Sequence, residues 1–325
     1  MDRRTFTLMV AAAALALAPH VARSQGAASY PTKPIRIIVA GPPGIPPDVI
    51  ARILGERLSA SLGQSVFVEN RPGTSGIIAF QTLARSAPDG YTLGIISLPA
   101  VVTPNLFAQV TYDVEKDFAP VTLIIWNYQV LAVRAASFGS VADLIAAAKA
   151  KPGALNFASG GNGTPPHLAG ELFKRAAGVD IVHIPYKGML EAFAAVLAGD
   201  AHMMIGGTGG ISPHVKSGKL RALATSAPQR IAAYPDLPTF AELGYPEVQL
   251  RDFQGILAPA GTPKDLIARL HAEIAKATAT PDVRRRLEAL GMEVASIGPE
   301  EFGAHIRSEL HRWAKVVRDA GIKPD

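Results

Sequence analysis

The chain has 325 residues, of which 48% are hydrophobic and 18% charged, a composition that excludes a disordered or collagen-like protein and predicts about two globular domains. The formal net charge is +5; three arginines and one aspartate give the first 28 residues +2, so the remaining +3 is too small to indicate a nucleic-acid groove. No cysteine is present, which excludes disulfides, thiolate metal sites and a cysteine nucleophile.

Residues 1–28 have the pattern of a secretory signal peptide. Arg3 and Arg4 precede an apolar run from Leu8 to Ala18. That run is too short to span a membrane, because a transmembrane helix needs about 20 residues. The arginine pair also resembles a twin-arginine signal, and the sequence decides neither the export route nor the cleavage position. We expect an exported, periplasmic mature protein; the alternative is a buried N-terminal helix.

The first part of the mature chain alternates between strand and helix patterns. Strands are predicted at 35–39, 66–69 and 92–97, and helices at 48–62 and 77–85. This order predicts a mostly parallel sheet with helices on both faces.

The alternation then repeats and gives way to a helical C-terminal third. Strands are predicted at 131–133, 155–158, 181–184, 202–205, 221–225 and 255–258, and helices at 140–150, 165–177 and 189–198, with further helices beginning near 262, 280 and 299. Two sheets in one chain predict a discontinuous first lobe, residues 30–125 plus 256–325, with residues 126–255 inserted as a second lobe. The crossings near 125 and 255 would form a hinge; two sequential domains are the alternative.

Two loops rich in glycine and proline follow predicted strands and begin predicted helices, at 41–48 and 159–167. Ligands of open α/β sheets bind at this edge, and a helix start attracts anions through its unpaired N–H groups. The candidate binding residues in the loops are Pro43, Gly44, Ile45, Pro46, Asp48, Ser159, Gly161, Asn162, Gly163, Thr164 and His167. The alternative is that both loops are ordinary turns.

Signals for catalysis, cofactors and metals are weak. Neither loop has a dinucleotide or P-loop spacing, no Gly-x-Ser-x-Gly occurs, and the histidines lack metal-ligand spacing. We therefore expect no cofactor, no metal and no catalytic residue. An exported hydrolase using Ser75 or Ser159 is the alternative from another class of protein.

Several segments resemble the Bug-type substrate-binding proteins of tripartite tricarboxylate transport systems. The resembling segments cover nearly the whole mature chain in order: 30–39, 63–73, 87–93, 183–188, 218–224, 237–242 and 258–263. The first reads YPTKPIRIIV, and the last reads APAGTP. Each motif is weak alone, and together they are specific.

The resemblance implies a type II periplasmic binding protein, an α/β fold of two doubly wound lobes joined by a hinge with the ligand cleft between them. It implies a binding protein and not an enzyme. The ligand would be a small mono-, di- or tricarboxylic acid, aromatic acids included, delivered to a membrane permease of the tripartite tricarboxylate type. The loop after Gly73 would also face the cleft, which adds Thr74, Ser75 and Gly76. We expect a monomer without nucleic-acid partners; a sensory module for a membrane receptor would use the same cleft and is not distinguished.

Three departures from the family pattern concern the ligand. Residues 45–47, Ile-Pro-Pro, replace small or hydroxyl residues, and two prolines remove two N–H donors. Residues 74–76 replace an alanine-glycine-glycine stretch. Gly206 stands where relatives that bind amino acids have an aspartate. We therefore expect a ligand without an ammonium group, and a bulkier or aromatic one; neither the identity of the acid nor that of the permease follows from the sequence.

Overall fold

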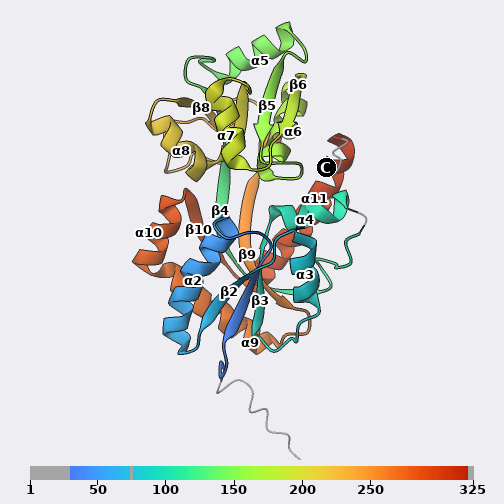
Figure 1. Cartoon of the computed structure of the whole chain (residues 1–325), viewed down its shortest axis with the longest axis vertical. Helices are drawn as coiled ribbons and strands as arrows, with labels where there is room; N and C mark the ends of the chain where they lie inside the picture. Colours follow the sequence, from blue (N-terminus) through green and yellow to red (C-terminus); the bar gives the residue numbers. More distant parts are fainter. Residues whose placement is uncertain (1–29, 74–75, 108, 321–325) are drawn as a thin grey trace, which may run out of the picture.

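The computed structural model describes residues 30–73, 76–107 and 109–320. Its strands and helices form two lobes, one above the other in Figure 1, and strands β4 and β9 run from one lobe into the other. The strand order is β2-β1-β3-β9-β4-β7-β5-β6, with β10 and β8 each paired to β4. The expected two-lobe α/β architecture is thus confirmed, while the predicted signal peptide, residues 1–28, lies outside the described residues.

The first lobe, lower in Figure 1, is built on a sheet in which β1 pairs in parallel with β2 and β3. Helices α2, α9 and α10 pack on one face of this sheet, and α3, α4 and α11 pack on the other. The bounds are β1 (Ile35–Val39), α2 (Pro46–Leu62), β2 (Val66–Asn70), α3 (Ile77–Ala84), β3 (Thr92–Ser97), α4 (Leu98–Leu106), α9 (Lys264–Ala279), α10 (Pro281–Ala289), β10 (Met292–Ile297) and α11 (Pro299–Ala320).

In the second lobe, β5 pairs in parallel with β6 and β7, and β4 closes the sheet through antiparallel pairing with β7 and β8. The bounds are α5 (Val141–Ala150), β5 (Leu155–Ser159), α6 (Pro165–Ala177), β6 (Ile181–Pro185), α7 (Met189–Ala198), β7 (Met203–Gly207), α8 (Thr208–Lys216), β8 (Leu220–Thr225) and the 3₁₀ turn η3 (Pro246–Val248). The predicted cap of α5 is confirmed, because Ser140 Oγ accepts a hydrogen bond from the Asp143 N–H at 3.1 Å.

Two crossing strands join the lobes, and both are longer than predicted. β4 spans Phe118–Arg134 and β9 spans Arg251–Pro259, whereas the sequence predicted strands only at 131–133 and 255–258. The two strands pair antiparallel from Phe118 to Tyr128. The lobe boundaries near 125 and 255 therefore fall inside strands, and they stay predictions.

Close packing of the first sheet explains one of its glycines. A Cβ at Gly255 would lie 2.3 Å from the Phe302 ring and 2.7 Å from the Thr122 carbonyl oxygen. Only glycine lets α11 pack this tightly on β9. α11 therefore packs directly on β9, one of the two strands that run from one lobe into the other.

Candidate functional site

The two predicted loops connect β1 to α2 and β5 to α6, so they lie at the carboxyl ends of parallel strands, one in each lobe. Both helices begin with two prolines, Pro46–Pro47 in α2 and Pro165–Pro166 in α6. Proline suits the first turn of a helix because its missing N–H has no intrahelical acceptor there. These prolines remove two of the donors that a helix start would otherwise present to an anion.

Asp48 stabilises the first loop through hydrogen bonds to its buried carboxylate. Its Oδ2 accepts hydrogen bonds from the Gly44 N–H at 2.8 Å and from Arg52 Nε at 3.0 Å, and its Oδ1 accepts from Asn70 Nδ2 at 2.9 Å. The side chain is only 2% exposed. Burial raises its pKa, but the hydrogen bonds outweigh burial and lower the pKa below its ordinary value. Asp48 is therefore an anionic support for the loop rather than a lining residue.

The second loop is held by a serine and two stacked histidines. Ser159 Oγ lies 2.7 Å from His183 Nε2 and accepts a hydrogen bond from the Gly161 N–H at 3.1 Å. The Gly163 N–H donates to His167 Nδ1 at 3.1 Å, and the rings of His167 and His183 stack at 4.0 Å. Burial, reinforced by His183 and Lys174, lowers the pKa of His167 to about 3, so this ring is the neutral acceptor that the loop requires.

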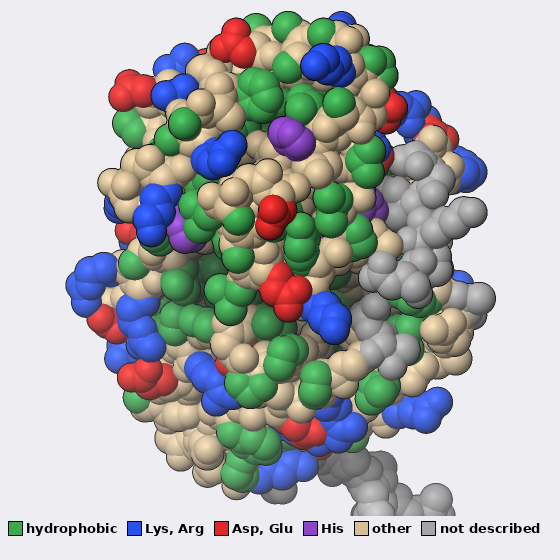
Figure 2. Space-filling view, turned by 45° about the horizontal axis from the view of Figure 1, so that its top comes forward, with side chains coloured by type: hydrophobic (Ala, Val, Ile, Leu, Met, Phe, Trp, Pro, Cys, Tyr) green, Lys and Arg blue, Asp and Glu red, His purple; other side chains and the backbone are tan. Residues whose placement is uncertain are grey.

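Between the lobes lies a cleft of two adjoining chambers with volumes of about 450 and 440 Å³. Pro46, Thr164, Pro165 and Asp252 line both chambers. Figure 2 shows hydrophobic side chains gathered in the recess between the upper and lower halves of the molecule. Each chamber is large enough for a small organic molecule.

The two lobes approach each other closely at both ends of the cleft. A Cβ at Gly209, in α8, would lie 2.1 Å from the carbonyl oxygen of Leu290, which follows α10. At the other end, a Cβ at Gly163 would lie 2.8 Å from Leu106 Cδ1 at the end of α4. The two lobes therefore approach each other on both sides of the space between them.

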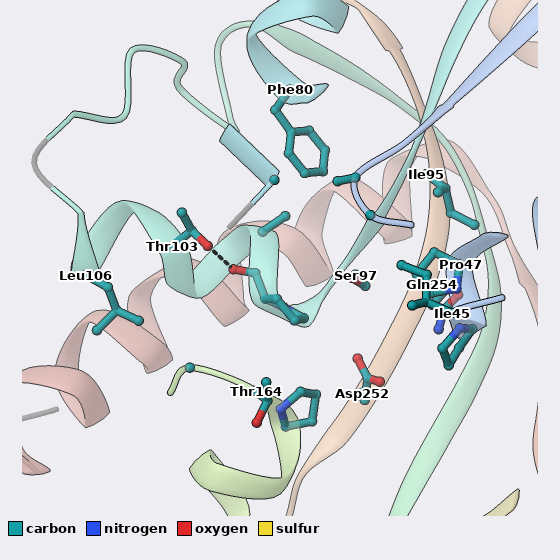
Figure 3. A pocket seen from close by; sticks show the side chains of 18 of the residues that line it. Ile45, Pro47, Phe80, Ile95, Ser97, Thr103, Leu106, Thr164, Asp252 and Gln254 are labelled. Carbon is teal, nitrogen blue, oxygen red and sulfur yellow. Dashed lines mark hydrogen bonds between the residues drawn. The ribbon is translucent and has the colours of Figure 1, made fainter. Parts of the chain in front are cut away.

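The walls of the cleft are mainly apolar. In the first chamber they come from α3, α4 and the first loop, and Figure 3 shows Phe80, Leu106 and Ile95 around that space. In the second chamber they come from α7 and the end of α10, including Phe193 and Leu290. Such walls suit an apolar ligand body.

The structure brings about half of the predicted binding residues to the cleft. The lining members are Gly44, Ile45, Pro46, Gly76, Asn162, Gly163 and Thr164. The members outside both linings are Pro43, Asp48, Ser159, Gly161, His167 and Gly206. Thr74 and Ser75 lie outside the described residues. The assignment of ligand contacts among these residues stays a prediction.

Sequence reasoning missed a row of polar side chains on the crossing strands. Asn127 and Gln129 lie on β4, and Asp252 and Gln254 lie on β9. Asn127 pairs with Asp252 across the strands, and residues two apart share a face, so all four lie on one face and line the cleft. The signal was present in the sequence as N-x-Q and D-x-Q within otherwise apolar strands.

Asp252 is the acid of this row. Its side chain is 6% exposed, and Oδ1 has no hydrogen-bond partner. Burial raises its pKa to about 7, although the N–H of Leu98, the Asn127 amide and the N–H of Phe253 act in the opposite direction. In the view of Figure 3, Asp252 on β9 lies to the right of Thr164 of the second lobe and below Ser97 of the first.

For Ser159 the geometry does not favour the hydrolase alternative, while Ser75 lies outside the described residues. Ser159 is fully buried behind the second loop, whereas a nucleophile must reach its substrate. Across residues 30–73, 76–107 and 109–320, no group of three or more histidine, aspartate or glutamate side chains could hold a metal ion. In the same part of the chain, no helix combines the length and apolarity needed to cross a membrane.

Two α/β lobes, two crossing strands and a cleft lined by a loop from each lobe define the periplasmic binding protein class, which binds solutes and does not catalyse reactions. Residues 50–322 match the family described as the tripartite tricarboxylate transporter family receptor, and the chain belongs to this family. The resemblance inferred from the sequence, the fold class and the expectation of a non-enzyme are therefore confirmed.

Individual relatives support the same assignment. The chain is 38% identical over 306 residues to the protein BugT of Bordetella pertussis, covering 93% of this chain and 94% of BugT. It is similar to the solved structure of Rpa4515 of R. palustris with adipate, with 33% identity, a TM-score of 0.81 and coverage of 91% of this chain and 100% of that one. It is also similar to MatC of Rhodopseudomonas palustris with bound malate, with 30% identity, a TM-score of 0.77 and coverage of 89% and 100%.

Proposed function

We propose that this protein captures a small carboxylic acid in the cleft between its lobes and delivers it to a membrane permease of the tripartite tricarboxylate type. The observation that carries the proposal is the cleft that the loops before α2 and α6 line together, one from each lobe. Two similar structures hold dicarboxylates, adipate and malate, which supports a carboxylate as the ligand. Residues 1–28 would act as the export signal that places the mature protein in the periplasm.

Binding would proceed by closure of the lobes around an unchanged ligand. The moving bodies would be residues 30–125 plus 256–325 and residues 126–255, with the hinge on β4 and β9. Closure is favoured only by contacts that the ligand makes in the closed state, and the loops at Ile45 and Thr164 would supply them. A micromolar affinity needs about −8 kcal/mol in total. The closed shape would then be the form that the permease recognises.

The direct test is thermal-shift screening and calorimetry on the mature chain, residues 29–325, with adipate, malate, citrate and benzoate. Stabilisation should increase with ligand concentration as RT ln(1 + [L]/Kd), and the acid should be recovered chemically unchanged. Failure of every acid to shift the transition, or turnover of any of them, would refute the proposal.

Two variants test the second loop. Thr164 lines both chambers, and its Oγ1 donates to the Gly161 carbonyl at 2.7 Å. Thr164→Ala and Gly163→Pro should weaken the ligand-induced shift. Ser217→Ala is the control, because Ser217 lies outside both chambers. A full shift in both loop variants would remove this loop from the site.

A further inference from the structure

The crossing strands place an acceptor-rich row on the floor of the cleft. Three oxygens of this row, Asp252 Oδ1, Gln129 Oε1 and Gln254 Oε1, are buried and have no hydrogen-bond partner. Their side chains are 6%, 1% and 2% exposed, respectively. A buried polar atom without a partner destabilises a folded protein. Three such atoms on one face of two paired strands suit a site whose partner comes from the ligand.

The electrostatics of the cleft point the same way. Among the described residues that line the two chambers, Asp252 is the only charged side chain. Burial raises the pKa of Asp252 to about 7. Above that pH the carboxyl is ionised, and a second carboxylate of the ligand placed beside it would meet a like charge among chamber linings that supply no cation, which is unfavourable. A hydroxyl or N–H group would instead donate to the carboxyl. With Asp252 ionised, such a hydrogen bond is charge-assisted and about twice as strong as a neutral one.

The position of Asp252 separates this contact from the carboxylate contact of the proposed function. Asp252 lies where the two chambers meet, and Gln254 and Gln129 extend the row into the first and the second chamber. The two loops precede α2 and α6, whereas the row of polar side chains lies on β4 and β9. A ligand could therefore reach the loops with its carboxylate and Asp252 with another group. The missing acid at Gly206 does not exclude a donor, because Asp252 supplies a carboxyl elsewhere in the cleft.

We propose that Asp252, flanked by Gln129 and Gln254, selects carboxylic acids that carry a hydrogen-bond donor, a hydroxyl or amine, on an apolar body. This inference rests on the proposed function and deepens it by naming the ligand class. The apolar walls formed by Phe80, Leu106 and Phe193 contact the body of the ligand, and Asp252 distinguishes a substituted acid from a plain one.

The test uses four six-carbon acids that differ only in the group opposite the carboxyl: hexanoate, 6-hydroxyhexanoate, 6-aminohexanoate and adipate. Benzoate and 4-hydroxybenzoate form the aromatic pair. Calorimetry on the mature wild-type chain should show that a donor-bearing acid binds about ten- to hundredfold more tightly than the matched plain acid. The hydroxy and amino arms identify which donor the carboxyl accepts. Equal affinities of plain and donor-bearing acids would refute the inference without any variant.

Substitution of the acid gives the second arm. In Asp252→Ser and Asp252→Asn, donor-bearing acids should bind at most about threefold more tightly than the matched plain acids. Thr278→Val is the control: Thr278 is a buried polar residue (0% exposed) of α9 and lines neither chamber. It should keep the wild-type preference. A preference unchanged in both Asp252 variants would also refute the inference, whereas failure of every acid to bind the wild type would refute the proposed function itself.

Discussion

The contact between Gly209 and Leu290 gives a sharp test of lobe closure. Gly209 is the second residue of α8, and a Cβ there would lie 2.1 Å from the Leu290 carbonyl oxygen. Because that obstacle is backbone, Gly209→Ala requires the two segments to separate until the distance reaches at least 3.0 Å. The two residues belong to elements packed on the sheets of different lobes. The extra distance must therefore come from a wider spacing between the two lobes.

The size of the effect follows from the type of clash. Extra methyl groups in closely packed sites typically cost about 1–3 kcal/mol. If that cost falls only on the closed form, ligand affinity should drop about 5- to 150-fold. The free protein should not lose stability in the open form, because alanine is a better helix former than glycine by about 1 kcal/mol. Weaker binding with unchanged or higher stability is a combination that simple misfolding does not produce.

The assay compares Gly209→Ala with the wild type in two quantities: the calorimetric affinity for the acid that binds best, and the melting temperature of the free protein. Gly303→Ala is the control: Gly303 lies within α11, its Cβ would come no nearer than 3.4 Å to a neighbouring atom, and it lines neither chamber. It should bind the acid as tightly as the wild type. Small-angle scattering should show a larger radius of gyration for ligand-saturated Gly209→Ala than for the ligand-saturated wild type. If Gly209→Ala binds as tightly as the wild type, the contact at Leu290 is not part of the liganded state and the closure argument fails.

Three further predictions concern the loops and the sheet. Asp48→Asn should lower stability by about 1–3 kcal/mol near neutral pH. In denaturation curves the difference should shrink as pH falls from about 3.9 through the lowered pKa of folded Asp48, because the unfolded carboxyl is protonated first and the hydrogen bonds to the ionised carboxyl are lost only at the lower pKa. Wild-type stability should fall as pH drops from about 6.5 towards 3, because His167 is protonated in the unfolded chain but stays neutral in the folded protein. His167→Ala should flatten this part of the stability curve. An unaltered slope would mean that the hydrogen bond from the Gly163 N–H does not depend on the neutral ring. Gly255→Ala should lower the melting temperature sharply, since its Cβ would lie 2.3 Å from an aromatic ring of α11, and an unchanged melting temperature would show that this helix can shift freely.

Elements with strong local signals could be predicted from the sequence, and elements set by long-range packing could not. The helix Pro165–Ala177 and the strand Ile35–Val39 begin and end as predicted, because proline, glycine and β-branched residues mark their limits. α4 was missed because Pro99 and Pro104 lie within its span and indicate a break. In the structure, α4 packs against α11, more than 190 positions away in the chain, and this burial outweighs the unfavourable local signal.

The same distinction applies to the cleft. Both loops were found because glycine, proline and helix-start patterns are local. Asp252 was not found, because its importance depends on the pairing of β9 with β4, which places it opposite Asn127. The alternation of polar and apolar residues in these strands indicates one polar face, but not that this face would line a cleft. That information lies in the three-dimensional arrangement of the two lobes.

The prolines and the acid together change which interactions can discriminate between ligands. Pro46 and Pro165 line both chambers and offer no N–H, while the N–H groups of Gly44 and Gly163 donate within their own loops. Fewer backbone donors are thus left for a carboxylate than two helix starts would otherwise provide. Recognition must then depend more on burial of an apolar body and on polar contacts to the strands, which move with the hinge. A single change on β9 should therefore alter ligand preference more than a single change in either loop.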